Sequence, residues 1–137
     1  MTPEQITQVR SSFALTLPRS GQIAAAFYER LFRTTPQLRP MFKTDIAEQG
    51  RKLMLTLATI VANLDKLDVL LPEAAELARR HQLYGVRDAH YALVGTALIE
   101  TLRAELGERF TPAIEAAWSV AYQALSGAMI ASAKDAA

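Results

Sequence analysis

The sequence predicts an all-α fold of about seven helices, and three observations support this prediction. Apolar residues recur every three or four positions over long stretches, which is the spacing of one face of a helix. No stretch alternates apolar and polar residues as a half-buried strand does. The six glycines and six prolines mostly fall between the periodic segments. Half of the 137 residues are apolar, so we expect one domain with a sizeable core over residues 1–137.

The expected helix starts are marked by capping residues, several of them followed by proline. Thr2, Pro3 and Gln5 have the spacing of a capping box with proline at the first helical position. Further starts are expected at residue types that cap or open helices. Ser20 starts a helix to about Arg33, Thr35–Pro36 start a short turn, and Asp45 starts a helix to about Lys66. Pro72 starts the next helix, Asp88 starts one that ends at Gly107, and Thr111–Pro112 start a long last helix.

Composition excludes several classes of function. The net charge is +1, so nothing indicates a nucleic acid or an anionic membrane surface as partner. The absence of cysteine excludes disulfides and thiolate metal sites and fits a reducing compartment. The most apolar run, Leu53 to Leu64, is too short to span a bilayer of roughly 30 Å. The first residues, MTPEQITQVRSSF, lack the apolar centre of a signal peptide, so a cytoplasmic protein is expected.

Both histidines lie in the stretch LARRHQLYGVRDAHY, Leu77 to Tyr91. His81 is expected on an apolar helix face, with Gly85 ending that helix and Asp88 capping the next one, whose first turn holds His90. A lone histidine on a helix is most often an ordinary half-buried residue. Haem iron, however, needs only one proximal imidazole, whereas zinc needs several ligands. The stretch alone leaves haem and no cofactor open, and zinc is poorly supported.

Two polar side chains occupy inner positions of expected helices. Tyr28 lies on the inner stripe of the helix from Ser20, where a buried hydroxyl needs a partner, most commonly a backbone carbonyl. Gln49 stands at the start of the inner stripe that continues through Leu53 and Leu57. Because it lies in the first turn of the helix, an exposed position for Gln49 is an equally good interpretation. Phe42 follows in a non-helical corner, where its large ring must cover something flat or apolar.

Four segments in a fixed order resemble the bacterial haemoglobins, the single-domain globins of the flavohaemoglobin class and the Hell's Gate globin type. They are FYERLFRTTPQLRPMF (Phe27 to Phe42), RKLMLTL, RRHQLYGVRDAHYALVG and AAWSVAY. The resemblance runs from about residue 4 to about residue 130. It implies the globin fold, with helices crossing at about 50° around a haem.

The resemblance also implies roles for individual residues. His81 resembles the proximal iron ligand, because Arg80-His81 through Gly85-Val86 matches the family's K/R-H-x-x-x-G-V context. Tyr28 and Gln49 resemble the distal tyrosine and glutamine that face bound dioxygen. Phe42 resembles the corner phenylalanine that packs on the haem face, and Tyr91 resembles the tyrosine on the proximal side. Leu53 resembles the apolar distal residue above the iron, and Leu57 follows it one turn later on the same stripe. His90 is then an ordinary histidine and not a ligand.

One position departs from the family. Flavohaemoglobins carry a glutamate in the last helix that makes the proximal histidine more anionic, and Ala133 stands at that place here. Peroxidase-like activation of oxygen is therefore disfavoured. Arg80 suits a haem propionate, although a solvated arginine is an equally good interpretation.

The resemblance implies a haem b globin that binds dioxygen reversibly with high affinity and also nitric oxide and carbon monoxide. Nitric oxide dioxygenation is a further expectation, and it needs an external reductase, because no reductase domain and no G-x-G-x-x-G motif accompany the globin pattern. A gas sensor or signalling globin that works through a partner protein is the alternative. No nucleic-acid or membrane partner is expected, and the protein is expected to be a monomer or a weak homodimer.

Overall fold

The structure is a computed structural model that describes residues 1–42, 45–83 and 87–136; for 67–69, 82–83, 88 and 132–136 it describes the backbone alone. These ranges contain six α-helices and three short 3-10 segments, and no strand. In chain order they are α1 (Pro3–Thr16), η1 (Leu17–Arg19), α2 (Ser20–Thr34), η2 (Pro36–Met41), α3 (Ile46–Ala62), α4 (Leu67–Leu83), α5 (Asp88–Leu106), η3 (Gly107–Arg109) and α6 (Pro112–Ala136).

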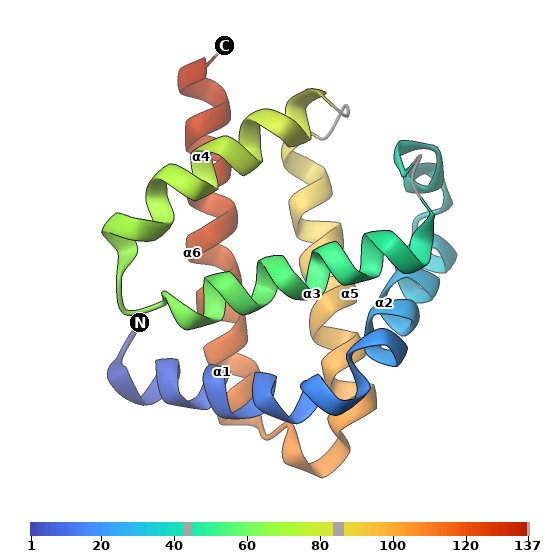
Figure 1. Cartoon of the computed structure of the whole chain (residues 1–137), viewed down its shortest axis with the longest axis vertical. Coiled ribbons are helices and arrows are strands. Elements are labelled where there is room, and N and C mark those ends of the chain that lie inside the picture. The colour runs from blue at the N-terminus through green and yellow to red at the C-terminus, as the bar shows by residue number, and fades with distance from the viewer. Residues whose placement is uncertain (43–44, 84–86, 137) are drawn as a thin grey trace.

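The helices form two layers that cross each other. α5 and α6 run antiparallel behind α3 and α4 (Figure 1). α2 packs on both α3 and α5, α1 packs on α6 and α3, and α4 packs chiefly on α6. α3 and α4 are consecutive, yet they diverge from the turn that joins them and are not among the closely packed helix pairs (Figure 1). The fold therefore holds two neighbouring helices apart, each supported by different partners.

Local capping chemistry accounts for several helix ends as predicted. The Thr2 hydroxyl accepts the Gln5 amide at 3.1 Å, and the Gln5 side chain accepts the Thr2 amide at 3.0 Å, which completes the capping box of α1. The Thr111 hydroxyl accepts the Ile114 amide at 3.2 Å at the start of α6. α5 ends at Leu106, before Gly107 with φ of +58°, a conformation that favours glycine.

The starts predicted at Ser20 and Asp88 are confirmed, but their predicted capping roles are wrong, and so is the start predicted at Pro72. Ser20 already has helical backbone angles, because η1 leads directly into α2, and the N-cap is Arg19. Pro72 lies inside α4, which begins five residues earlier at Leu67. Asp88 is the first residue of α5, and the extended residue before it, Arg87, is the N-cap.

The imidazole of His90 contributes to the amino-terminal end of α5 as the third helical residue of a capping box. The amide of Arg87 donates to Nδ1 of His90 at 2.9 Å. This contact agrees with the interpretation of His90 as an ordinary histidine whose ring already has a hydrogen-bonding partner.

The buried apolar side chains form two separate clusters. The main cluster joins α1, α2, α3, α5 and α6 around residues such as Leu31, Phe27, Leu102 and Trp118. A smaller cluster consists of Ala74 and Ala78 of α4 with Met129 of α6, and Leu77, Tyr91 and Leu125 pack against it. Of the helices in the described ranges, none combines the length and apolar character that crossing a bilayer requires.

Candidate functional site

Tyr28 lies in the main core, at the centre of a group of aromatic rings. Its side chain is only 3% exposed. The ring centroids of Phe27, Phe32 and Phe42 lie 4.9, 5.8 and 5.5 Å from its own. Edge-to-face and stacked contacts of this kind fix the ring and leave the hydroxyl as the one polar group in an apolar environment.

A close crossing of α2 and α3 brings Gln49 to this hydroxyl. Gly50 of α3 lies against Ala24 of α2 so closely that an added Cβ would be 3.0 Å from the Ala24 methyl group. Gln49 is next to Gly50, and Tyr28 is one turn after Ala24, so the crossing places both polar side chains together. Burial raises the pKa of Tyr28 to about 12, while a side-chain hydrogen bond with Gln49 acts in the opposite direction. The hydroxyl therefore stays protonated at neutral pH and can act as a donor.

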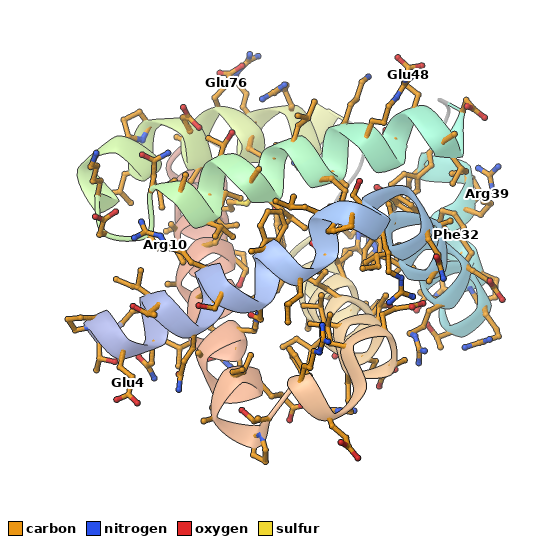
Figure 2. All side chains as sticks on the ribbon, turned by 60° about the horizontal axis from the view of Figure 1, so that its bottom comes forward. Glu4, Arg10, Phe32, Arg39, Glu48 and Glu76 are labelled. Atoms are coloured by element: carbon orange, nitrogen blue, oxygen red, sulfur yellow. The ribbon has the colours of Figure 1, made fainter. Side chains whose placement is uncertain are left out.

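Arg39 fixes the corner that carries Phe42. Its guanidinium lies 5.2 Å from the centroid of the Phe32 ring, and its Nη1 donates to the carbonyl oxygen of Phe42 at 3.0 Å (Figure 2). The rings of Phe32 and Phe42 are 5.2 Å apart. One exposed arginine thus holds both sides of the corner, and this role depends on contacts that residue spacing alone did not reveal.

The face of α3 that carries Gln49 is apolar but incompletely covered. Leu53 and Leu57 are only half-buried, and the fully buried residues of this helix are Gly50 and Val61. Thr56 and Ile60 continue the same face toward the end of the helix. Leu53, Leu57 and Ile60 pack against the main core on one side, and the part of this apolar face that stays exposed leaves room for a further apolar contact.

His81 is presented by the last turn of α4. Its Nδ1 lies 2.6 Å from the carbonyl oxygen of Leu77, which assigns the proton to Nδ1 and leaves the lone pair on Nε2. The ring of Tyr91 lies 6.2 Å from the imidazole, with the planes tilted by 34°. His81 is half-buried. Its geometry is that of a metal-ligating histidine whose second nitrogen is held by the backbone.

Tyr122 of α6 supports the backbone at Tyr91. Its hydroxyl donates to the carbonyl oxygen of Tyr91 at 2.6 Å. Its ring lies on Gly95, where an added Cβ would be 2.5 Å from the ring, so only glycine permits this approach. Burial raises the pKa of Tyr122, so this donor also remains neutral. The sequence offered AAWSVAY as a family segment but gave no indication of this contact.

A cavity of about 180 Å³ lies between α3 and α4. Its walls come from three helices: Thr56, Thr59 and Ile60 of α3, Leu70, Glu73, Ala74, Glu76, Leu77 and Arg80 of α4, and Leu125 of α6. His81 shares its helix face with Leu70, Ala74 and Leu77. Gln49 and Leu53 share theirs with Thr56 and Ile60. Gln49 and His81 therefore belong to the two helix faces that border the cavity, although neither residue lines the cavity itself.

The remaining predicted residues are either exposed or outside the part of the chain that the structure describes. Arg80 is exposed and lies 4.0 Å from a carboxylate oxygen of Glu76, so its cation is partly engaged at the cavity wall. Tyr84, Gly85 and Val86, and the side chain of Ala133, lie outside the described residues.

The site fits a flat apolar group that brings its own metal. Within the described residues, no three His, Cys, Asp or Glu side chains gather to hold a metal ion. His81 could therefore hold a metal only with further ligands from a non-protein group. The cavity between α3 and α4 lies beside the helix that carries His81, and apolar side chains such as Ile60, Leu70 and Leu77 form part of its wall. One imidazole nitrogen without a protein partner, apolar neighbours, the buried Tyr28 and the half-buried Gln49 are features that suit a haem protein.

Comparison with known proteins identifies the family. The Globin family profile matches residues 25–129. Flavohemoproteins of Vibrio cholerae and Bacillus subtilis are each 30% identical, over 89% and 98% of this chain but 32% and 35% of their own length. The structure of a bacterial globin from Campylobacter jejuni superposes with a TM-score of 0.87 at 25% identity, covering 98% of both chains. The chain belongs to the globin family, and it spans about one third of the length of these curated relatives.

Family membership confirms the predicted all-α globin fold and the predicted kinship with bacterial haemoglobins. As a globin related to flavohemoproteins, the chain is a haem protein that binds a gas. The type of haem, the preferred gas and the role of each residue remain predictions.

Proposed function

We propose that this chain binds haem b through Nε2 of His81 and holds dioxygen reversibly with high affinity. The main support is the position of the half-buried Gln49 side chain beside the buried Tyr28 hydroxyl. Gln49 lies on α3 and His81 lies on α4, and these two helices border the cavity. When bound, haem supplies a ferrous iron that accepts diatomic gases.

The protein residues determine what surrounds the gas. Phe42, Leu53 and Leu57 provide apolar walls that exclude water from the pocket. The Leu77 carbonyl fixes the His81 imidazole in one tautomer, and Tyr91 limits how far the ring can turn. These contacts leave Nε2 as a preorganised ligand.

The Tyr28 hydroxyl is the donor we expect to decide the ligand preference. Dioxygen accepts negative charge when it binds, so a hydrogen-bond donor in the pocket favours it more than it favours carbon monoxide. Gln49 both contacts this hydroxyl and can donate through its own amide. Two donors beside an apolar wall therefore predict slow release of dioxygen, which suits scavenging better than bulk delivery.

Nitric oxide dioxygenation is part of the proposal as an activity that requires a separate reductase. The similar flavohemoproteins are about three times as long as this chain. None of the residues placed at the site could take electrons from a nicotinamide, so we expect the donor to be a second protein. Cytoplasmic location, and a monomer or weak homodimer, belong to the same proposal.

An absorption spectrum of the purified protein tests the central point. We expect about one non-covalent haem per chain, since the sequence has no cysteine to attach it. Admitting air to the reduced protein should give a dioxygen spectrum that reverses under vacuum. A protein that incorporates no haem, or that is oxidised at once by air without holding dioxygen, would contradict the proposal.

A further inference from the structure

The carboxyl end of α3 is capped without a glycine. A helix leaves its last four carbonyls without intrahelical partners, and they must be satisfied elsewhere. Here Asn63 satisfies two of them: its Nδ2 donates to Thr59 at 2.8 Å, and its amide donates to Ile60 at 3.1 Å. Among the described residues only Gly107 has a positive φ, so the usual left-handed cap is absent from this turn.

The other two carbonyls are satisfied by Arg10, a residue of α1. Its Nε donates to the carbonyl oxygen of Val61 at 3.0 Å, and its Nη2 to that of Ala62 at 2.9 Å. Nη2 also contacts a carboxylate oxygen of Asp65 at 2.8 Å, and this hydrogen bond lowers the pKa of Asp65. A cation at the carboxyl end of a helix also interacts favourably with the helix dipole. Figure 2 shows Arg10 reaching from α1 to this end of α3.

The position of this turn affects the cavity directly. Thr59 and Ile60, in the last turn of α3, form part of the cavity wall. The opposite wall belongs to α4, which packs on α6 and not closely on α3. The separation of the two walls at this end therefore depends on what anchors the end of α3. Among the described residues, the hydrogen bonds that reach this end from another helix come from Arg10.

We propose that Arg10 is a positioning residue for the haem site. By holding the carboxyl end of α3 and the turn to α4, it sets the distance between the α3 and α4 walls of the cavity and slows haem loss. The inference rests on the proposed haem binding. It concerns a side chain of α1, a helix that contributes none of the predicted pocket residues.

The test is Arg10→Met, which keeps much of the apolar stem and removes every hydrogen bond. Haem loss is measured as transfer from the ferric protein to an excess of apomyoglobin. We expect transfer to become faster by on the order of tenfold, since two helix-end carbonyls lose their partners. Hydrogen exchange at the amides of Asn63 and Lys66, which bond within this turn, should also become faster in Arg10→Met.

Arg19→Met is the matched control. Arg19 also caps a helix end from a distance: it donates to the carbonyl oxygen of Glu105 at 3.3 Å and to its carboxylate at 2.7 Å, near the end of α5. Neither residue lines the cavity. Arg19→Met should lower the melting temperature by a similar amount and leave the haem transfer rate within twofold of the original, a margin of about 0.4 kcal/mol.

Two results would overturn the inference: transfer from Arg10→Met at the original rate, or equal acceleration in both variants. If Arg10→Met does not fold, Arg10→Lys and Arg19→Lys provide the same comparison, because lysine keeps the charge but cannot bond both carbonyls in the fixed geometry of a guanidinium. A wild-type protein without haem would instead refute the proposed function, so the two failures can be told apart.

Discussion

Replacing Tyr28 by phenylalanine is the most direct test of how the pocket holds dioxygen. The ring contacts with Phe27, Phe32 and Phe42 do not involve the hydroxyl, so the phenylalanine ring should occupy the same place. The substitution removes the donor and its interaction with Gln49 and little else. Any change in gas binding can then be assigned to one oxygen atom.

The size of the effect follows from the state of that hydroxyl. Because burial raises the pKa of Tyr28 to about 12, the hydroxyl is fully protonated at pH 7 and available as a donor. A hydrogen bond to a charged acceptor contributes roughly 1.5–3 kcal/mol, and each 1.4 kcal/mol is about tenfold. Dioxygen should therefore leave Tyr28→Phe about ten to a hundred times faster.

The assay is stopped-flow replacement of dioxygen by excess carbon monoxide on the reduced protein. Gln49→Leu forms the second arm, and it should also release dioxygen faster. The double variant should show less than the sum of the two effects, because the side chains contact each other. Carbon monoxide release, measured by replacement with nitric oxide, serves as the internal control and should change several-fold less.

Unchanged dioxygen release in both single variants would refute the reasoning. Tyr28 would then be a core tyrosine with an internal partner, and Gln49 would be no more than that partner. Equal acceleration for dioxygen and carbon monoxide would point instead to a looser pocket, and the hydrogen-bond argument would fail.

Three further predictions concern the two histidines, the ionisation of Tyr28 and the consumption of nitric oxide. His81→Ala should lose haem or its normal ferrous spectrum and His90→Ala should retain both; the reverse pattern in the absorption spectra would mean that the ligand is misassigned. The folded-state pKa of Tyr28, raised from 10.0 to about 12, favours the neutral form, so its contribution to the free energy of unfolding is complete below pH 10 and is lost as pH rises toward 12. The free energy of unfolding of the apoprotein, measured with urea, should fall over this pH range by up to about 2–3 kcal/mol more in the wild type than in Tyr28→Phe. The same dependence on pH in both proteins would show that the hydroxyl ionises freely. Finally, nitric oxide should be consumed once per dioxygen-loaded haem, with repeated turnover only when a reductase is added; sustained turnover with NADH alone, followed with a nitric oxide electrode, would contradict the proposal.

Local signals in the sequence predicted the parts of the fold that local chemistry determines. The reciprocal bonds of Thr2 and Gln5 need only residues three apart, and the glycine that ends α5 needs only its own backbone freedom. Pro72 misled the prediction because proline is most favourable at the first position of a helix, whereas Pro72 is the sixth residue of α4. Asp88 misled it because the helix includes Asp88 as its first residue, so the N-cap is Arg87, whose amide donates to His90.

The site was predictable in its residue types but not in its supports. A polar residue on an apolar stripe, such as Tyr28 or Gln49, is visible in the spacing alone. The close crossing at Gly50 depends on Ala24, which is 26 positions away, and Arg10 bonds carbonyls 51 and 52 positions away. No spacing rule within one helix connects such residues, so only the tertiary structure reveals them.

The separation of the two apolar clusters has a consequence for the order of assembly. In the part of the chain that the structure describes, the main cluster joins five helices and contains no residue of α4. Two buried residues of α4, Ala74 and Ala78, pack with Met129 of α6. Five helices can therefore collapse together before α4 is in place, and α4 can detach without opening the main core. During synthesis, haem could enter a nearly finished protein, and the docking of α4 would close the pocket behind it.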